Sequence, residues 1–244
     1  MIGAGQIVRV DDLSQALRVS PVTIRRDLEQ LQRAGLLERT HGGAVRTRPF
    51  GPEPLYADKR LRCAPEKQRI ARLAATLVRT GQTILLNGGT TSLAVALAIS
   101  ERTDVGELHL VTVNVAIGLE VQRRDIDVVL LGGQYRPQAN SLVGTLALAS
   151  LRHIAADLVV LGVDGIDARF GATYPHSLEA GVAEAMLDRC HGEVIVVADH
   201  RKLGVAAGNV GAPLKRVSYL ITDTGADERL VQEFRRCGVE VLLA

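Results

Sequence analysis

A short run rich in glycine and hydroxyl side chains could bind a phosphate. The run consists of Asn87, Gly88, Gly89, Thr90, Thr91 and Ser92. It lies between an expected buried strand over 83–87 and an expected helix over 92–102. Glycines let the backbone approach a ligand closely, hydroxyl groups add donors, and a helix N-terminus attracts an anion. The same run is also typical of a strand-to-helix turn capped by Thr or Ser, and it lacks the Lys-Ser/Thr pair of a Walker A loop.

Two acids and one lysine follow later strands, where they could meet the same ligand. Asp164 comes directly after an expected buried strand, Glu179 begins the next helix, and Lys202 follows the strand over 194–198. If these loops converge, a carboxylate pair with a lysine could bind sugar hydroxyls and phosphate, or do acid–base work. The alternatives are local, because Glu179 would also stabilise a helix N-terminus and Lys202 would also suit a solvated surface.

Two more strand ends supply candidate ligand contacts. Asn114 follows the expected strand over 108–113 and could bond a ligand hydroxyl, although capping the next helix is the simpler interpretation. Gly133 follows the strand over 126–131 and would let the backbone approach a ligand, although a plain turn explains it equally well.

These loops need a scaffold that brings them together, and the pattern from Ala64 onward predicts one. Short aliphatic strands alternate there with helices. This alternation favours an α/β fold, a mostly parallel, doubly wound sheet with helices on both faces. In such open sheets, ligands bind beyond the carboxyl ends of the strands. The candidate residues all follow strands, so the fold class predicts that they share one edge.

The N-terminal part of the chain has a different pattern. Ser20 and Pro21 can begin a helix, in which Ile24, Leu28 and Leu31 share one face. A short helix before it and a Gly42-Gly43 hairpin after it complete a winged helix-turn-helix, whose second helix enters the DNA major groove. The candidate DNA contacts are Ser20, Val22, Thr23, Arg25, Arg26 and, in the wing, His41.

The stretch VSPVTIRRDLEQLQRAGLLERTHGGA resembles the DeoR family of bacterial transcriptional regulators, because TIRRDL and HGGA are specific in combination. The resemblance covers nearly the whole chain. It implies a C-terminal sensor domain similar to sugar-phosphate isomerases and deaminases, in which Gly89 to Ser92 hold a phosphate. Asp164, Glu179 and Lys202 fall where those enzymes keep catalytic or substrate-contacting groups. The resemblance further implies operator DNA and a phosphorylated sugar as partners, repression as the usual outcome, and a dimer or tetramer.

The N-terminal module departs from the family. A DeoR-type module has a further helix before this point, and here only Met1 to Gln6 stand in its place. Either the start codon is assigned too late, or the module is impaired, or a partner chain covers the apolar face of the two helices. Of these we favour a truncated gene model. The expected domains are the helix-turn-helix over 1–47, a linker over 48–62 with three prolines, and the sensor domain over 63–244.

Composition narrows the class of protein. No apolar run of about 18 residues is present and no signal peptide opens the chain, so a cytoplasmic protein without a membrane span is expected. The three cysteines have no zinc-like spacing, and we expect no metal and no cofactor. Residues 1–62 hold eleven Lys and Arg against seven Asp and Glu, which fits a polyanion partner at that end.

Three functions compete on this basis. The first is a DNA-binding regulator, a repressor of carbohydrate-metabolism genes that is not an enzyme and responds to a phosphorylated sugar. The second is a sugar-phosphate isomerase or deaminase that uses Asp164, Glu179 and Lys202. The third is a degraded regulator that binds ligand but not DNA. The first is favoured because the N-terminal stretch has no use in an enzyme.

Overall fold

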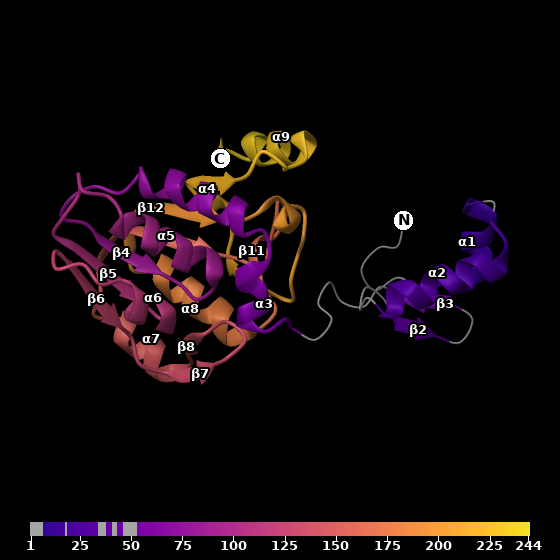
Figure 1. The fold of residues 1–244 in the computed structure, drawn as a ribbon, viewed down its shortest axis with the longest axis horizontal. Helices are drawn as coiled ribbons and strands as arrows, with labels where there is room; N and C mark the ends of the chain where they lie inside the picture. The colour runs from indigo at the N-terminus through magenta and orange to yellow at the C-terminus, as the bar shows by residue number, and fades with distance from the viewer. Residues whose placement is uncertain (1–6, 18, 34–37, 41–42, 46–52) are drawn as a thin grey trace. The chain divides into compact units, whose positions relative to one another are not determined.

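The structure is a computed structural model that describes residues 7–17, 19–33, 38–40, 43–45 and 53–244. The chain forms two compact units, Met1–Pro54 and Leu55–Ala244 (Figure 1). Among the described helices, none has the length and apolar character needed to cross a membrane.

The N-terminal unit has the element order of a winged helix-turn-helix. It comprises β1 (Ile7–Arg9), α1 (Val10–Leu17), α2 (Pro21–Arg33), β2 (Glu38–Thr40) and β3 (Gly43–Val45). The strands form an antiparallel sheet in the order β1-β3-β2, with Ile7 opposite Val45. Val10, Leu13, Ile24 and Leu28 form its buried cluster. The α2 helix begins as predicted, because the Ser20 hydroxyl accepts a hydrogen bond from the Thr23 backbone N–H at 3.2 Å.

The C-terminal unit is built on a seven-stranded parallel sheet, in the order β15-β14-β12-β9-β4-β5-β6. Its strands are β4 (Thr83–Leu86), β5 (Leu108–Thr112), β6 (Ile126–Leu130), β9 (Ala156–Gly162), β12 (Cys190–Val197), β14 (Tyr219–Thr222) and β15 (Glu240–Leu243). The central strands are buried on both faces, so they are aliphatic throughout rather than alternating. The predicted α/β fold class is therefore confirmed.

Helices cover both faces of this sheet (Figure 1). On one face, α4 (Ala64–Ala75), α5 (Thr90–Ser100) and α6 (Val115–Glu120) share a core with one set of strand side chains. On the other face, α7 (Thr145–Leu151), α8 (Ser177–Leu187) and α9 (Glu228–Arg236) share a second core with the alternate set. Successive side chains of a strand point to opposite faces, which explains the two cores.

Smaller elements decorate the carboxyl ends of the strands. A hairpin of β7 (Gln134–Arg136) and β8 (Ser141–Val143) follows β6. A small antiparallel sheet joins β10 (Gly165–Asp167), β11 (Gly171–Tyr174) and β13 (Asn209–Ala212). Two single-turn 3-10 helices, η1 (His200–Lys202) and η2 (Leu214–Arg216), complete the unit. These insertions lie where the sequence placed its candidate ligand residues.

The segment predicted as a linker over 48–62 differs in its second half, where Tyr56–Leu61 form helix α3. The helix belongs to the C-terminal unit. Arg60 forms a two-pronged ion pair with Glu120 at 2.9 Å for both bonds, and Lys59 reaches Asp164 at 3.4 Å. The sequence pattern missed α3 because these distant polar partners, rather than a periodic apolar face, hold it in place.

The order of strands reverses between β4 and β9. The chain proceeds from β4 outward through β5 to β6, and then returns to β9 and proceeds the other way through β12 and β14 to β15. Loops after β4 and β9 therefore leave in opposite directions and open a crevice between them. The fold thus points to the segments after Leu86 and Gly162 as the place for a ligand.

Candidate functional site

The Asn87 side chain joins the two strands at the reversal point. Its amide nitrogen donates to the Gly162 carbonyl at 2.8 Å and to the Tyr174 hydroxyl at 3.1 Å. Its amide oxygen accepts from the Gly162 N–H at 2.8 Å and from the Ser92 hydroxyl at 2.7 Å. All these groups are buried, so the amide fixes the spacing between the loop after β4 and the loop after β9.

The loop after β4 leads into the N-terminus of α5, whose N-cap residue, Gly89, has no side chain to cap the helix. Gly89 has a φ of +107°, which a residue with a side chain rarely adopts, and it precedes the first turn of α5. The Gly89 carbonyl accepts a hydrogen bond from the Asn114 amide at 2.9 Å. The Asn114 amide oxygen in turn accepts from the Ala116 N–H at 3.1 Å, so Asn114 caps α6. The simpler interpretation of Asn114 is thus confirmed, and its side chain also holds Gly89.

The three hydroxyl residues of the first turn of α5 have different surroundings. Thr90 donates to the Lys59 carbonyl at 3.5 Å, and Ser92 donates to Asn87. The Thr91 hydroxyl is buried and has no hydrogen-bond partner in the described structure. Because an unsatisfied buried hydroxyl costs free energy, Thr91 is the hydroxyl of this turn with most to gain from a ligand.

Two of the predicted ligand-contacting glycines have packing roles. A Cβ atom at Gly88 would lie 2.6 Å from the Ser141 Cβ, and one at Gly133 would lie 2.7 Å from the Val143 carbonyl oxygen. Both positions therefore need glycine because neighbouring chain approaches them closely. The Ser141 hydroxyl beside Gly88 is itself buried without a hydrogen-bond partner in the part of the chain that is described.

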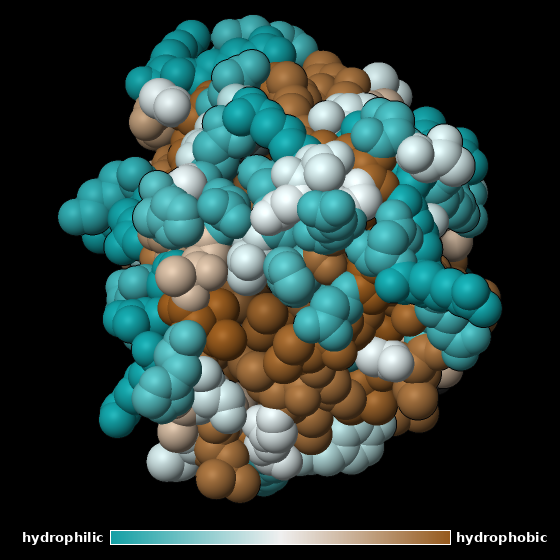
Figure 2. Space-filling view, turned by 90° about the vertical axis from the view of Figure 1, so that its left-hand side faces the viewer, coloured by the Kyte–Doolittle hydropathy of each residue, from teal (hydrophilic) through white to brown (hydrophobic). Residues whose placement is uncertain are grey.

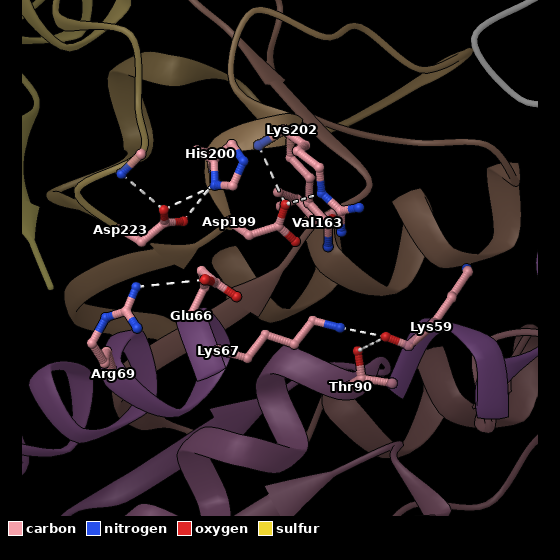
Figure 3. A network of polar contacts seen from close by, with 12 residues as sticks. Lys59, Glu66, Lys67, Arg69, Thr90, Val163, Asp199, His200, Lys202 and Asp223 are labelled. Atoms are coloured by element: carbon pink, nitrogen blue, oxygen red, sulfur yellow. Dashed lines mark hydrogen bonds and ion pairs between the residues drawn. The ribbon is translucent and has the colours of Figure 1, made fainter. Parts of the chain in front are cut away.

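A buried lysine that the sequence analysis did not select lies at this edge (Figure 3). Lys67 of α4 is only 5% exposed, and its ammonium donates to the Lys59 carbonyl, the acceptor that Thr90 also uses. Burial, together with the nearby charge of Lys202, lowers the pKa of Lys67 to about 8, while the charge of Asp199 acts in the opposite direction. Lys67 is therefore a buried ammonium in a poorly solvated place, a kind of group that could bind an anion.

The structure brings the predicted acids and lysine into the same neighbourhood, each with a partner. Asp164 is ion-paired with Lys59, and Lys202 donates to the Val163 carbonyl at 2.6 Å. Glu179 lies 3.0 Å from the Arg136 guanidinium, and both side chains are largely buried. Burial raises the pKa of Glu179, the Arg136 charge opposes that rise, and the charge of Asp164 adds to it.

A cavity of about 220 Å³ lies beside the cluster, lined by residues of α3, α4 and α5. Its lining includes Arg60, Lys67, Arg72, Thr90 and apolar side chains of α5. The cavity shares a lysine and a threonine with the strand-end cluster but contains neither of the predicted acids. The cavity also has one carboxylate, Glu101, but the strand ends are the better candidate for a sugar phosphate, because they combine cations with two carboxylates that can accept sugar hydroxyls and with the helix start after β4.

The exposed face of α2 carries the residues predicted to contact DNA. Ser20, Val22, Thr23, Arg25 and Arg26 are all exposed, while Ile24 and Leu28 are buried on the opposite side. Contacts to DNA phosphates and bases require the polar side chains to lie on the exposed face of the helix, since the guanidiniums must extend away from the module to reach the DNA. His41 lies outside the described residues.

Sequence reasoning missed two lysines of the site, for different reasons. Lys67 shares its helical face with Ile70, Ala71 and Ala74, all buried, so a lysine within an apolar stripe was a signal that could have found it. Lys59 lay in a segment read as a linker, and its carbonyl and ammonium meet the site only through the tertiary fold.

Comparisons with known proteins cover both units. The family model "DeoR C terminal sensor domain" matches residues 62–224, and "DeoR-like helix-turn-helix domain" matches residues 1–49. The chain is 34% identical to the HTH-type transcriptional regulator GlpR of Haloferax volcanii, covering 96% of this chain and 90% of that protein. It is 32% identical to the glycerol-3-phosphate regulon repressor of Escherichia coli K12, covering 88% of this chain and 84% of that protein. The solved structure of ribose 5 phosphate isomerase A from Neisseria gonorrhoeae is similar at a TM-score of 0.41 and 15% sequence identity, covering 56% of this chain and 52% of that chain. Similarity at this level assigns no activity.

The buried lysine predicts a pH-dependent stability. Below about pH 8, Lys67 is charged in both states and its burial opposes folding. As the pH rises from about 8 toward 10.5, the native state loses this proton before the unfolded state does, so the free energy of unfolding rises. At pH 7.5 we expect Lys67→Met to have a higher free energy of unfolding than the wild type. This advantage of the variant is expected to shrink by roughly 1–3 kcal/mol between pH 7.5 and pH 10.5.

Urea denaturation of both proteins across this pH range measures the difference. Lys215→Met, at an exposed lysine of η2, is the matched control. A wild-type-to-Lys67→Met difference that stays constant with pH would contradict a charged, desolvated ammonium at this position.

Proposed function

Because the chain belongs to the DeoR family of transcriptional regulators, we propose that it is a repressor whose DNA binding responds to a phosphorylated sugar or polyol in the C-terminal unit. The observation that carries the effector proposal is the buried Lys67 ammonium, held with Lys202 beside the first turn of α5. Two relatives support the rest of it, since they are named as repressors of a glycerol-3-phosphate regulon and of an aga operon.

The effector would be recognised by complementary charge. Its phosphate would accept from the free N–H groups at the start of α5, from the Thr91 hydroxyl and from the ammonium groups of Lys67 and Lys202. Its hydroxyls would donate to the carboxylates of Asp164 and Glu179. In this assignment, Gly88, Gly89, Asn114 and Gly133 shape the loops, and Ser92 holds Asn87.

Helix α3 would report occupancy of the site. The Lys59 carbonyl is the acceptor for both Lys67 and Thr90, so a phosphate at these groups would compete with it. α3 is the first helix of the C-terminal unit, and the chain enters it from the helix-turn-helix module. A ligand that displaced the Lys59 carbonyl, and so favoured another position of α3, would therefore change how the DNA-binding module is tethered.

A DNA-binding titration tests the function as a whole. The full chain is titrated against labelled DNA flanking its own gene, alone and with glycerol 3-phosphate or hexose phosphates, and free glycerol is the matched control. We expect tight, sequence-specific binding that one phosphorylated ligand weakens at least tenfold and glycerol does not. Specific binding that no phosphorylated ligand changes would remove the effector proposal and leave the DNA-binding function standing.

The exposed guanidiniums of α2 predict the salt dependence of DNA binding. Arg25→Ala combined with Arg26→Ala is expected to weaken operator binding and to reduce the slope of log K against log salt by about one to two, because each lost phosphate contact releases fewer counterions. The control pair is Arg229→Ala with Arg236→Ala, exposed residues of α9. An unchanged slope in the α2 variant would argue against direct phosphate contact by these residues.

Thr91 predicts opposite changes in stability and in affinity. Thr91→Val removes a buried hydroxyl that has no partner in the described structure, so the ligand-free protein is expected to become about 1 kcal/mol more stable. Affinity for the effector, measured by calorimetry, is expected to fall by roughly 1–3 kcal/mol because a phosphate contact is lost. Higher stability with unaltered affinity would mean that the hydroxyl does not contact the ligand.

A further inference from the structure

The strand β6 is an edge strand of the large sheet. Its outward main-chain groups pair with no other described strand. Within the described structure, β5 is its only strand partner. The Leu131 N–H donates to Thr112 of β5 and the Asp125 carbonyl accepts from Leu108, so odd-numbered residues of this segment face β5. The even-numbered residues Val128 and Leu130 therefore turn their N–H and C=O groups toward the open edge.

The opposite edge of the sheet is blocked by a charged side chain. In β15, Glu240 and Ala244 donate to β14, so odd-numbered residues face outward there. The outward carbonyl of Val241 is already bonded to the Arg235 guanidinium at 3.1 Å. Charged groups at a sheet edge prevent pairing with another chain. No described side chain donates a hydrogen bond to the outward main chain of β6.

Exposed aliphatic side chains surround the open edge on both faces of the sheet. Val129 and Leu130 of β6 are 38% and 40% exposed, and Leu119 of α6 and Leu146 of α7 are 67% and 70% exposed. Leu130 lies over Gly118 of α6. Figure 2 shows a continuous apolar area on the lower part of this side of the molecule, where Figure 1 places β6, α6 and α7. Contiguous apolar surface of this kind marks an interaction site.

We propose that β6 pairs antiparallel with β6 of a second copy, about a two-fold axis at Val128, so that two sheets become one. The strand is self-complementary in this register. Val128 would exchange its N–H and C=O with its own equivalent, and Leu130 would donate to the Ile126 carbonyl, giving about four main-chain bonds. The four exposed aliphatic residues would meet their equivalents in an isologous contact.

The choice of a second copy rests on the proposed function, because helix-turn-helix regulators bind two half-sites through two-fold symmetric dimers. The single charged residue of β6, Asp127, lies 3.6 Å from the His109 ring of β5. In the proposed register Asp127 would lie opposite Val129 of the second copy, so like charges would not meet across the edge.

Light scattering and sedimentation of the full chain test the interface without reference to DNA. We expect a dimer or a multiple of it, and a Kd at least a hundredfold weaker in the variant Leu119→Lys with Leu146→Lys. Both positions are exposed, so circular dichroism and urea midpoint are expected to match the wild type. Leu243→Lys, on the opposite edge and 42% exposed, is the matched control and is expected to stay assembled.

A covalent probe tests the register. In a chain whose Cys63, Cys190 and Cys237 are changed to Ser, Val128→Cys is expected to form an intermolecular disulfide on mild oxidation, and Leu243→Cys is not. A monomeric wild type, or an assembly that survives the double lysine variant and gives no Val128→Cys cross-link, would overturn the β6 interface. Failure of the proposed function can be distinguished from failure of this interface, because it would give a dimer linked through β6 that does not bind DNA sequence-specifically.

Discussion

The amide of Asn87 is the interaction on which the rest of the C-terminal unit depends. It joins β4 to β9 where the order of strands reverses, and it does so with four hydrogen bonds in a buried place. A reversal point leaves two neighbouring strands without a shared crossover, so their loops diverge unless a side chain spans them. The start of α5 with Thr91 and the loop with Asp164 follow the two strands that this bridge joins.

Charge burial is the second constraint. A lysine as little exposed as Lys67 is unfavourable in a folded protein unless partners compensate for it, and here its ammonium donates to a main-chain carbonyl of α3. That hydrogen bond couples the position of a short helix to a buried ammonium. It also explains why α3, which has no buried residue of its own, is nevertheless held against the sheet unit.

Much of the architecture could be predicted from local patterns. Alternating aliphatic strands and helices predicted the parallel sheet, and Ser20 and Pro21 predicted the start of α2. The candidate site was predicted less completely. The Asn87–Ser92 loop, Asp164 and Lys202 were selected because they follow strands. Lys59 was missed because its segment has no periodicity, and Lys67 was missed because it lies within the apolar face of a helix. Patterns report which face of an element is apolar, and they do not report which distant carbonyl a side chain will meet.

The sequence by itself determined the family, the fold class and the helix-turn-helix face, because these depend on residue types at short, regular spacings. Only the tertiary structure decided the partners: Lys59 with Asp164, Arg136 with Glu179, and Arg235 on the outward carbonyl of Val241 in β15, whereas no side chain among the described residues bonds to the outward main chain of β6. The physical reason is that these contacts join residues far apart along the chain. Their formation depends on strand order and sheet register, which parallel crossovers fix and local propensity does not.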